Sequence, residues 1–295
     1  MWFFWSLGNA LAESIKDVFG KHGAQKFDEY LAAFSQRFFA LFLLIPLAFI
    51  FGNAKPDAIF WYATFGSVAI NIITSILYFR ALKESPLSLV LPIVTLSPIF
   101  LLFTSPLINR EVPSLLGIAG VIVSVFGTYL LNISKRKEGL FAPLKTIWSN
   151  QGTRFMLIVA FLWSISAPFD KVAVQHANPM LKTGDPYFYV AISHIFLALA
   201  LLPFVIKKIK PSRLFAPTSA RVLAPIGIVS GLAITFQMIA FSMTLVPYAI
   251  SVKRTSALFG ALWGKLFFKE VNLKERLVGA VVILVGAAMV LFSAL

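Results

Sequence analysis

Long apolar stretches separated by short polar breaks run along the whole chain. Each stretch is close to the roughly 20 residues that an α-helix needs to cross the hydrocarbon core of a bilayer. The stretches lack the alternating apolar and polar positions of barrel strands, and backbone polar groups in lipid must be satisfied within the segment. The pattern therefore predicts an all-α membrane protein. Its ten expected transmembrane helices cover residues 2–21, 31–51, 58–80, 86–108, 113–133, 155–175, 186–206, 222–244, 247–268 and 273–294.

The composition agrees with this class and excludes others. Of the 295 residues, 59% are hydrophobic and only 13% are charged, whereas roughly a quarter of the residues of a soluble domain are charged. Helices of about 20 residues leave loops of only about ten residues, so no soluble catalytic domain fits. The chain has no cysteine and its three histidines are far apart, so we expect neither a metal site nor a cofactor.

Basic residues outnumber acidic ones, and their positions predict a topology. The chain has 26 Lys and Arg against 12 Asp and Glu, a formal net charge of +14. Of the 26 basic residues, 18 fall in the odd-numbered loops and the adjoining helix ends, 3 in the even-numbered loops and 5 inside helices. The positive-inside rule then predicts cytoplasmic odd-numbered loops and both termini outside. The surplus charge fits a lipid bilayer as partner, and we expect no nucleic acid.

The chain divides into two similar halves. The longest polar stretch follows the fifth predicted helix, and it predicts a first five-helix repeat at residues 1–134, a basic cytoplasmic connector at 135–154 and a second repeat at 155–295. Because five is an odd number, the second repeat inserts upside down relative to the first. Inverted repeats are a recurrent plan of secondary transporters, which bind substrate near the midplane at the repeat interface.

Two alignments between the halves support this duplication. At an offset of 154, residues 14–24 align with residues 168–178. At an offset of 159, residues 110–127 align with residues 269–286. The glycines in the second alignment are expected to allow close approach of helices. The residues in register there include Glu111 with Glu270, Gly120 with Gly279, and Gly127 with Gly286.

Two segments carry a family resemblance. YFRALKESPLSLVLPIVTLSPIFLLFTSPLINREVPSLLGIAGVIVSVFGTYLL (78–131) and AFSMTLVPYAISVKRTSALFGALWGKLFFKEVNLKERLVGAVVILVGAAMVLF (240–292) resemble the two copies of the EamA-type repeat of the drug/metabolite transporter (DMT) superfamily. In the first predicted helix NALAES (9–14) replaces the Trp-Gly often seen in that family, whereas Arg37 stands where the family often has an arginine. The resemblance implies two inverted five-helix repeats, a central cavity and transport without ATP hydrolysis. The chain has no GxxxxGK[ST] phosphate loop, which agrees with that expectation.

Several ionisable residues fall well inside the predicted helices. Each costs about 2.5–3.5 kcal/mol or more near a helix centre unless it is paired or hydrated, so we expect these residues to face the interior of the bundle. Snorkelling towards the membrane surface accounts for basic residues near helix ends but less well for the Lys253–Arg254 pair, about seven residues (roughly 10 Å) into its helix. The other candidates are assigned to gating or coupling: Glu13, Lys16, Asp17, Arg37, Asp170, Lys171 and His194.

The sequence ISVKRTSALF (250–259) provides the candidate substrate site. It is similar to the Lys-Arg pair of the triose-phosphate and nucleotide-sugar translocators, distant members of the same superfamily, and the resemblance implies that Lys253 and Arg254 hold an anionic group. A guanidinium can grip two oxyanion oxygens, and an ammonium adds a compact charge. Further candidates for substrate contact are Asn71, Gln237, Tyr248 and Trp163, with interhelical hydrogen bonds and packing as the alternative use of these side chains.

The ionisable residues also predict two gates. Lys16 and Asp17 are expected towards the cytoplasmic side, and Asp170 and Lys171 towards the outer side, so the two dipeptides belong to opposite gates. The hypothesis pairs Asp17 with Arg37, and Asp170 with Lys253 or Arg254; fixed structural ion pairs are the alternative. Asp170 is expected to be the acid that neutralises the Lys253–Arg254 pair, which leaves a net positive pocket.

These features favour a secondary-active transporter that moves a small polar, anionic metabolite by alternating access. A proton-driven exporter of amino acids or amphipathic drugs is the alternative, since Glu13, Asp17 and His194 are titratable. An intramembrane enzyme and a scaffold or lipid scramblase are the other classes; we expect no enzyme, because no clustered catalytic set stands out. The expected partners are a small-molecule substrate and, in the alternative, protons. A monomer or homodimer in a prokaryotic inner (plasma) membrane is expected.

Overall fold

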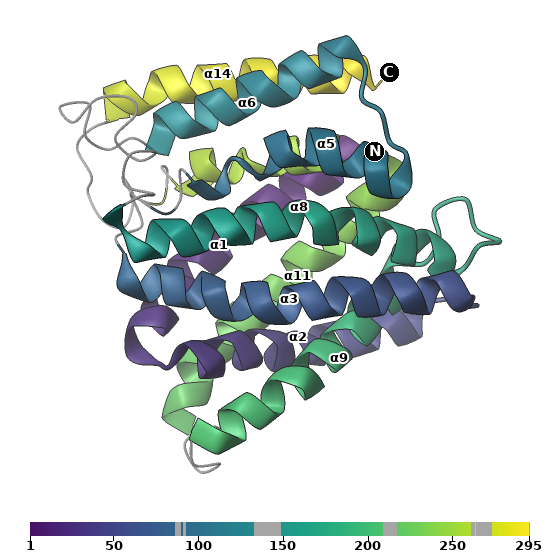
Figure 1. The fold of residues 1–295 in the computed structure, drawn as a ribbon, viewed down its shortest axis with the longest axis vertical. Coiled ribbons are helices and arrows are strands. Elements are labelled where there is room, and N and C mark those ends of the chain that lie inside the picture. The colour runs from purple at the N-terminus through teal and green to yellow at the C-terminus, as the bar shows by residue number, and fades with distance from the viewer. Residues whose placement is uncertain are drawn as a thin grey trace.

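A computed structural model describes the chain outside residues 86–89, 91–92, 133–148, 209–216, 261–262, 264–272 and 295. Within the described residues all regular secondary structure is helical, and the long helices run across Figure 1, some of them obliquely. The helices are α1 (Trp2–Lys26), α2 (Glu29–Phe51), α3 (Ala58–Glu84), α5 (Ser97–Asn109), α6 (Leu115–Asn132), α8 (Gln151–Ala177), α9 (Pro186–Lys208), α11 (Pro217–Met243), α12 (Val246–Lys253) and α14 (Leu273–Ser293).

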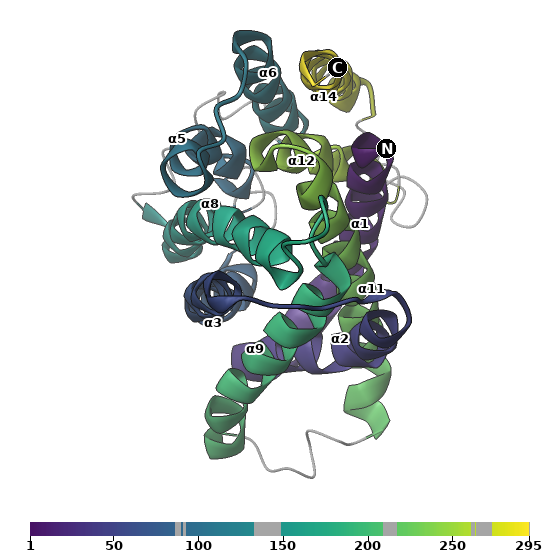
Figure 2. The same cartoon turned by 90° about the vertical axis from the view of Figure 1, so that its right-hand side faces the viewer.

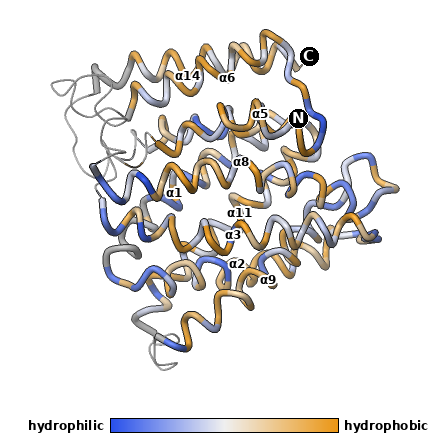
Figure 3. Tube along the Cα trace, in the orientation of Figure 1, coloured by the Kyte–Doolittle hydropathy of each residue, from blue (hydrophilic) through white to orange (hydrophobic). Residues whose placement is uncertain are grey.

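The distribution of apolar residues suits a lipid environment. By length and composition α2, α3, α8, α9 and α11 can each cross a bilayer, and α5, α6 and α14 contain shorter apolar helices. Large apolar side chains such as Phe49 and Leu107 are 86% and 83% exposed, which would be unfavourable in water over such an area. Figure 3 shows hydrophobic residues along the helices and hydrophilic ones gathered at the two ends of the bundle. The predicted all-α membrane architecture is confirmed.

Polar caps decide where several helices begin. Asp28 accepts a hydrogen bond from the backbone N–H of Tyr30 at 3.0 Å and begins α2. Asp57 accepts from Phe60 at 3.0 Å, and Asn150 begins α8 in the same way. These side chains satisfy N–H groups that have no acceptor within the helix. The predicted helices that they precede therefore start within a few residues of the expected positions.

Two of the predicted helices are wrong as continuous spans. The fourth has a turn at Thr95–Leu96 before α5, and the ninth has a turn at Arg254–Thr255 after α12. Pro98, in the first turn of α5, lacks a backbone donor and suits a helix start. After α12 the bonds tighten to the i→i−3 pattern, as from the N–H of Thr255 to the carbonyl of Val252 at 3.0 Å.

The two breaks occupy equivalent positions in the two halves. Arg254 follows Thr95 by 159 residues, and Thr255 follows Leu96 by the same number, which is the offset of the second sequence alignment. Within the described residues, α12 also contacts α5 directly. The interrupted helices of both halves therefore meet near one place.

The helices pair across the halves in a reciprocal pattern. The first helix of each half packs against the third helix of the other, α1 on α11 and α8 on α3. The second helices, α2 and α9, pack together, and so do the fifth helices, α6 and α14. In Figures 1 and 2 the α6–α14 pair lies at one edge of the molecule, α2 and α9 lie towards the other, and α1, α3, α8 and α11 lie between them.

Glycines allow α6 and α14 to approach closely, as the sequence predicted. A Cβ atom added to Gly127 would lie 2.5 Å from the backbone nitrogen of Ile283. One added to Gly286 would lie 2.4 Å from the backbone nitrogen of Ser124. Contacts this short with backbone atoms leave no room for a side chain, so these positions require glycine.

Candidate functional site

A cavity of about 120 Å³ lies among the helices of both halves. Its walls come from α1, α2, α3, α5, α8, α11 and α12, with Arg254 following α12 directly. Its charged lining residues are Glu13, Lys16, Arg37, Asp170, Lys253 and Arg254. Its uncharged polar lining residues are Gln36, Asn71, Ser75, Tyr78, Ser97, Trp163, Ser166, Ser230 and Gln237.

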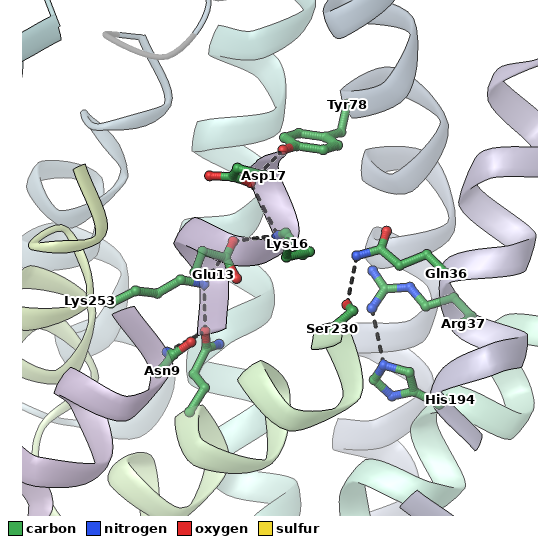
Figure 4. Close-up of polar contacts among 11 residues, drawn as sticks. Asn9, Glu13, Lys16, Asp17, Gln36, Arg37, Tyr78, His194, Ser230 and Lys253 are labelled. Carbon is green, nitrogen blue, oxygen red and sulfur yellow. Dashed lines mark hydrogen bonds and ion pairs between the residues drawn. The ribbon is translucent and has the colours of Figure 1, made fainter. Parts of the chain in front are cut away.

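Glu13 connects two lysines on one side of this cavity. Its Oε1 atom lies 2.5 Å from the ammonium of Lys16 and 3.6 Å from that of Lys253. Lys253 also donates a hydrogen bond to Gln237 Oε1 at 2.8 Å, and Asn9 Nδ2 donates to the same oxygen at 3.3 Å. Figure 4 shows Glu13 between Lys16 and Lys253. Glu13, which the sequence placed among gating residues, is therefore the acid beside Lys253.

Asp17 has other partners than the one predicted for it. It lies 3.8 Å from the ammonium of Lys16 and accepts a hydrogen bond from the hydroxyl of Tyr78 at 3.4 Å. The expected Asp17–Arg37 ion pair is not among the contacts of the described residues, and Asp17 does not line the cavity. The reason is rotation along α1: Lys16 and Asp17 are adjacent, so their side chains point about 100° apart.

Arg37 projects from α2 on the other side of the cavity, next to His194 (Figure 4). One guanidinium nitrogen lies 3.2 Å from His194 Nε2, and another donates to Ser75 Oγ at 3.1 Å. His194 Nδ1 lies 2.9 Å from the carbonyl oxygen of Val190, which can only accept. The geometry therefore assigns the proton to Nδ1 and leaves Nε2 to accept from Arg37. His194 is outside the cavity lining, where it positions Arg37.

Asp170 lines the cavity from α8. The sequence predicted that it pairs with Lys253 or Arg254, but the structure gives it other partners. Its Oδ1 atom accepts hydrogen bonds from the hydroxyls of Ser67 and Tyr189. These partners come from α3 and α9, against which α8 packs. Lys253 pairs instead with Glu13 of α1, whose Oε1 atom lies 3.6 Å from the ammonium group.

Arg254 lies at the turn that ends α12 and donates a hydrogen bond to Ser97 Oγ at the start of α5. Within the described part of the chain it forms no ion pair, unlike its neighbour Lys253. Its Nε atom is buried and has no hydrogen-bond acceptor there, and the same is true of Arg37 Nε. The two members of the predicted Lys-Arg pair thus have different surroundings.

Lys171 and Tyr248 lie outside the cavity lining, although both were candidates from the sequence. Lys171 forms a buried ion pair with Glu111 and donates to the carbonyl oxygen of Thr244 at 2.7 Å. Tyr248 is 3% exposed, and its hydroxyl accepts from the N–H of Ser114 at 3.1 Å. Lys171 is adjacent to Asp170 on α8, so the two side chains face different neighbours. Tyr248, a candidate for substrate contact from the sequence, therefore lies buried outside the cavity lining.

The cavity brings together most of the predicted site residues and adds others. Gln36 donates to Ser230 Oγ at 2.7 Å across the cavity wall, and neither was predicted. The lining serines and Tyr78 carry no sequence signal that separates them from packing residues. Glu111 could have been noticed from the sequence, because it was in register with Glu270 in the repeat alignment. Glu270 lies outside the described residues. The predicted lining residues are Glu13, Lys16, Arg37, Asn71, Trp163, Asp170, Gln237, Lys253 and Arg254.

The apolar helices around a charged cavity define the class as multi-helix membrane proteins. The sequence profile of the EamA-like transporter family matches residues 1–133 and 151–292. The chain therefore belongs to the EamA-like transporter family, and it is an integral multi-pass membrane transporter of the DMT type. This confirms the family resemblance found in the sequence.

Two comparisons agree with that membership. The chain is 25% identical over 294 residues to a protein of Archaeoglobus fulgidus described as an uncharacterized transporter, covering 97% of this chain and 96% of the relative. A solved crystal structure is 15% identical and covers 98% of this chain and 97% of its own, with a TM-score of 0.72. At that identity the structural likeness shows the shared fold alone.

Proposed function

We propose that the protein is a secondary-active transporter that moves a small anionic metabolite by alternating access. The observation that carries this proposal is the charge of the cavity wall. Four cations, Lys16, Arg37, Lys253 and Arg254, line it against two acids, Glu13 and Asp170. In a low-dielectric setting an unbalanced positive charge is unfavourable, and an anionic substrate compensates it.

The proposed movement is a rocking of one half of the chain against the other. The reciprocal helix pairing and the equivalent helix breaks support two inverted repeats, at residues 1–134 and 155–295. The connector proposed at 135–154 lies mostly outside the described residues. The cavity has walls from both halves, so a rocking motion exposes it to each side in turn. We place both termini outside the cell, in the inner (plasma) membrane of a prokaryote.

Within this proposal Arg254 is the main anion-binding residue and Lys253 has a supporting role. Arg254 has a buried N–H group without an acceptor in the described part of the chain, whereas Lys253 already contacts Glu13 and Gln237. Guanidinium groups bind carboxylates and phosphates through two parallel hydrogen bonds. Asn71, Gln237 and Trp163 line the same cavity and are the proposed neutral contacts.

A proton-driven exporter is the second candidate, and one observation favours it. Asp170 faces the cavity and is held through one oxygen by the hydroxyls of Ser67 and Tyr189. A buried carboxyl that substrate can reach is a suitable proton carrier. In that case substrate flux follows an imposed proton gradient, and Asp170→Asn uncouples the two.

Uptake into proteoliposomes tests both candidates. A ligand-stabilisation screen of phosphorylated sugars, carboxylates and amino acids first selects a radiolabelled substrate, and saturable counterflow is then measured. We expect flux of an anion that persists when an ionophore dissipates the proton gradient, and that Arg254→Gln reduces. Arg221→Gln, at an exposed position of α11, is the matched control. Flux of cations alone contradicts the anionic substrate, and the absence of any saturable flux contradicts the transport proposal.

A further inference from the structure

Two arginines of the cavity wall form no ion pair at contact distance within the described part of the chain. Arg37 comes from α2 and Arg254 from the turn after α12. The Nε–H group of each is buried and has no acceptor among the described residues. The two lysines of the same wall differ, because both lie within ion-pair distance of Glu13. A buried charged donor without an acceptor is unfavourable, so each arginine marks a position where a ligand acceptor fits.

The two arginines mark separate positions. Arg37 is held by Ser75 of α3 and His194 of α9, whereas Arg254 is held by Ser97 of α5. They share no hydrogen-bond partner. In Figure 4 Arg37 lies beside Gln36 and His194, across from Lys253. The two guanidinium groups are therefore held by different helices, each at its own place on the wall.

The charge of the wall favours an anionic ligand. Four cations stand against two acids among the lining residues, and Asp17, outside the lining but 3.8 Å from the ammonium of Lys16, reduces the surplus of the whole group to one positive charge. Glu13 is occupied by Lys16 and Lys253, and Asp170 accepts hydrogen bonds from the hydroxyls of Ser67 and Tyr189. Asp170 and Glu13 attract Arg37 from beyond contact distance, and Glu13 and Asp17 attract Arg254 in the same way, so the arginines share the surplus charge with the rest of the wall.

We propose that the cavity binds a small dianion with two separate acidic groups, one at Arg254 and the other at Arg37. This inference rests on the proposed function and names its substrate class: a short dicarboxylate or a phosphorylated carboxylate. The cavity volume of about 120 Å³ is below the roughly 150 Å³ of an engineered cavity that holds benzene. A short carbon chain between the two acidic groups suits this volume.

Binding of matched monoanions and dianions to the purified full-length protein tests the proposal. Succinate and butyrate have the same number of carbons but two and one carboxylates, and phosphoglycolate replaces one carboxylate by phosphate. We expect succinate or phosphoglycolate to bind at least about tenfold more tightly than butyrate, which is the effect of one additional charge-assisted hydrogen bond. Tighter binding of succinate would identify the second acidic group as a carboxylate, and tighter binding of phosphoglycolate would identify it as a phosphate.

Variants of the two arginines separate this proposal from the proposed function. Arg37→Gln is expected to reduce succinate affinity about tenfold or more and to change butyrate affinity little, because butyrate still binds at Arg254. Arg37→Lys keeps the charge but removes the Nε–H group, so it is expected to fall between wild type and Arg37→Gln. This second variant keeps the test valid if the glutamine variant does not fold. Arg221→Gln should bind both anions like the wild type.

Two outcomes overturn the dianion proposal. One is equal affinity of the wild type for succinate and butyrate. The other is an unchanged preference for succinate in the folded Arg37 variants. If Arg254→Gln still weakens the binding of both anions in those cases, the proposed transport of an anion stands, and only the second anion position at Arg37 is wrong. If the folded wild type binds no anion, including phosphate, the proposed function itself is wrong.

Discussion

The ammonium group of Lys171 on α8 and the carboxylate of Glu111, in the segment between α5 and α6, form a buried ion pair. The second oxygen of Glu111 accepts a hydrogen bond at 2.9 Å from the N–H of Val246, the first residue of α12. Lys171 also donates to the carbonyl of Thr244, which precedes α12. One acid and one base therefore hold together three segments: α8, the α5–α6 connection and the start of α12.

Removing one partner of this pair is expected to destabilise the protein. Glu111→Gln leaves a buried ammonium without its counter-ion, and breaking a buried pair in this way costs about 3–5 kcal/mol. In the double variant Glu111→Gln/Lys171→Gln no unpaired charge remains, so the loss is expected to be smaller than the sum of the two single losses. Thermal unfolding in detergent measures this, with the exposed Lys182→Gln as control. Additive losses would show that the two residues act independently.

The Lys253–Arg254 pair is expected to respond unequally to neutralisation. Arg254→Gln should weaken anion binding by about 1.5–3 kcal/mol, roughly tenfold to 150-fold, because one charge-assisted contact is lost. Lys253→Gln should cause a smaller loss, since Lys253 already contacts Glu13 and Gln237. Titration calorimetry on folded variants measures both losses. A larger loss in the lysine variant would mean that substrate displaces Glu13 from Lys253.

The contact between α6 and α14 is expected to tolerate no added methyl group. In Gly127→Ala the new Cβ atom would lie 2.5 Å from the backbone nitrogen of Ile283, which cannot move without its helix. Gly66→Ala on α3 is the matched control, because its Cβ atom would lie 3.9 Å from the ring of Phe169, an ordinary contact. We expect a lower melting temperature for Gly127→Ala. Gly66→Ala should match or exceed the wild type, because alanine favours helix by about 1 kcal/mol.

Asp57 at the start of α3 gives the stability a dependence on acid pH. Desolvation acts to raise its pKa, but hydrogen bonds from His176 and from the N–H of Phe60 outweigh it, so the pKa of Asp57 lies below its usual value. Because the pKa of Asp57 is lower in the folded chain than in the unfolded chain, where it is about 3.9, the ionised carboxylate stabilises the fold above that pH. This contribution is lost as the pH falls through the folded-state pKa.

Comparison of the wild type with Asp57→Asn measures that contribution. Asparagine retains the helix cap but not the charge, and the side chain of Asp57 is 38% exposed, so the difference is expected to be about 1 kcal/mol or less. The difference between the melting temperatures should be present at neutral pH, begin to shrink near pH 4 and disappear once the pH is below the folded-state pKa of Asp57. A difference that persists in acid would assign the effect to the shape of the side chain.

The topology predicted from the basic loops is open to direct labelling. The two termini lie at the same end of the bundle (Figure 1), and the chain has no native cysteine. A membrane-impermeant maleimide added to intact cells should label Ser293→Cys and Thr183→Cys, which the prediction places outside. Lys26→Cys, on a predicted cytoplasmic loop, should react only after lysis. The reverse pattern would invert the topology.

The hydropathy pattern by itself determined the all-α membrane class and the approximate position of most helices, such as α2 and α9. It could do so because the length of an apolar run and the caps at its ends are local properties of the chain. Charge in the membrane likewise identified Lys16, Arg37 and Arg254 as residues of the interior, since lipid exposure of such groups is too costly. The family resemblance could also be recognised from the sequence, because its motifs are contiguous in the chain.

Only the tertiary structure decided which charged residues meet. Asp170 and Lys171 are adjacent in the chain, yet one lines the cavity and the other pairs with Glu111. Lys253 is paired with Glu13, more than two hundred residues away in the chain, and not with Asp170. A partner of this kind depends on how each helix is rotated and where it crosses its neighbours, and those quantities are set by packing between the halves. The sequence does not specify them locally.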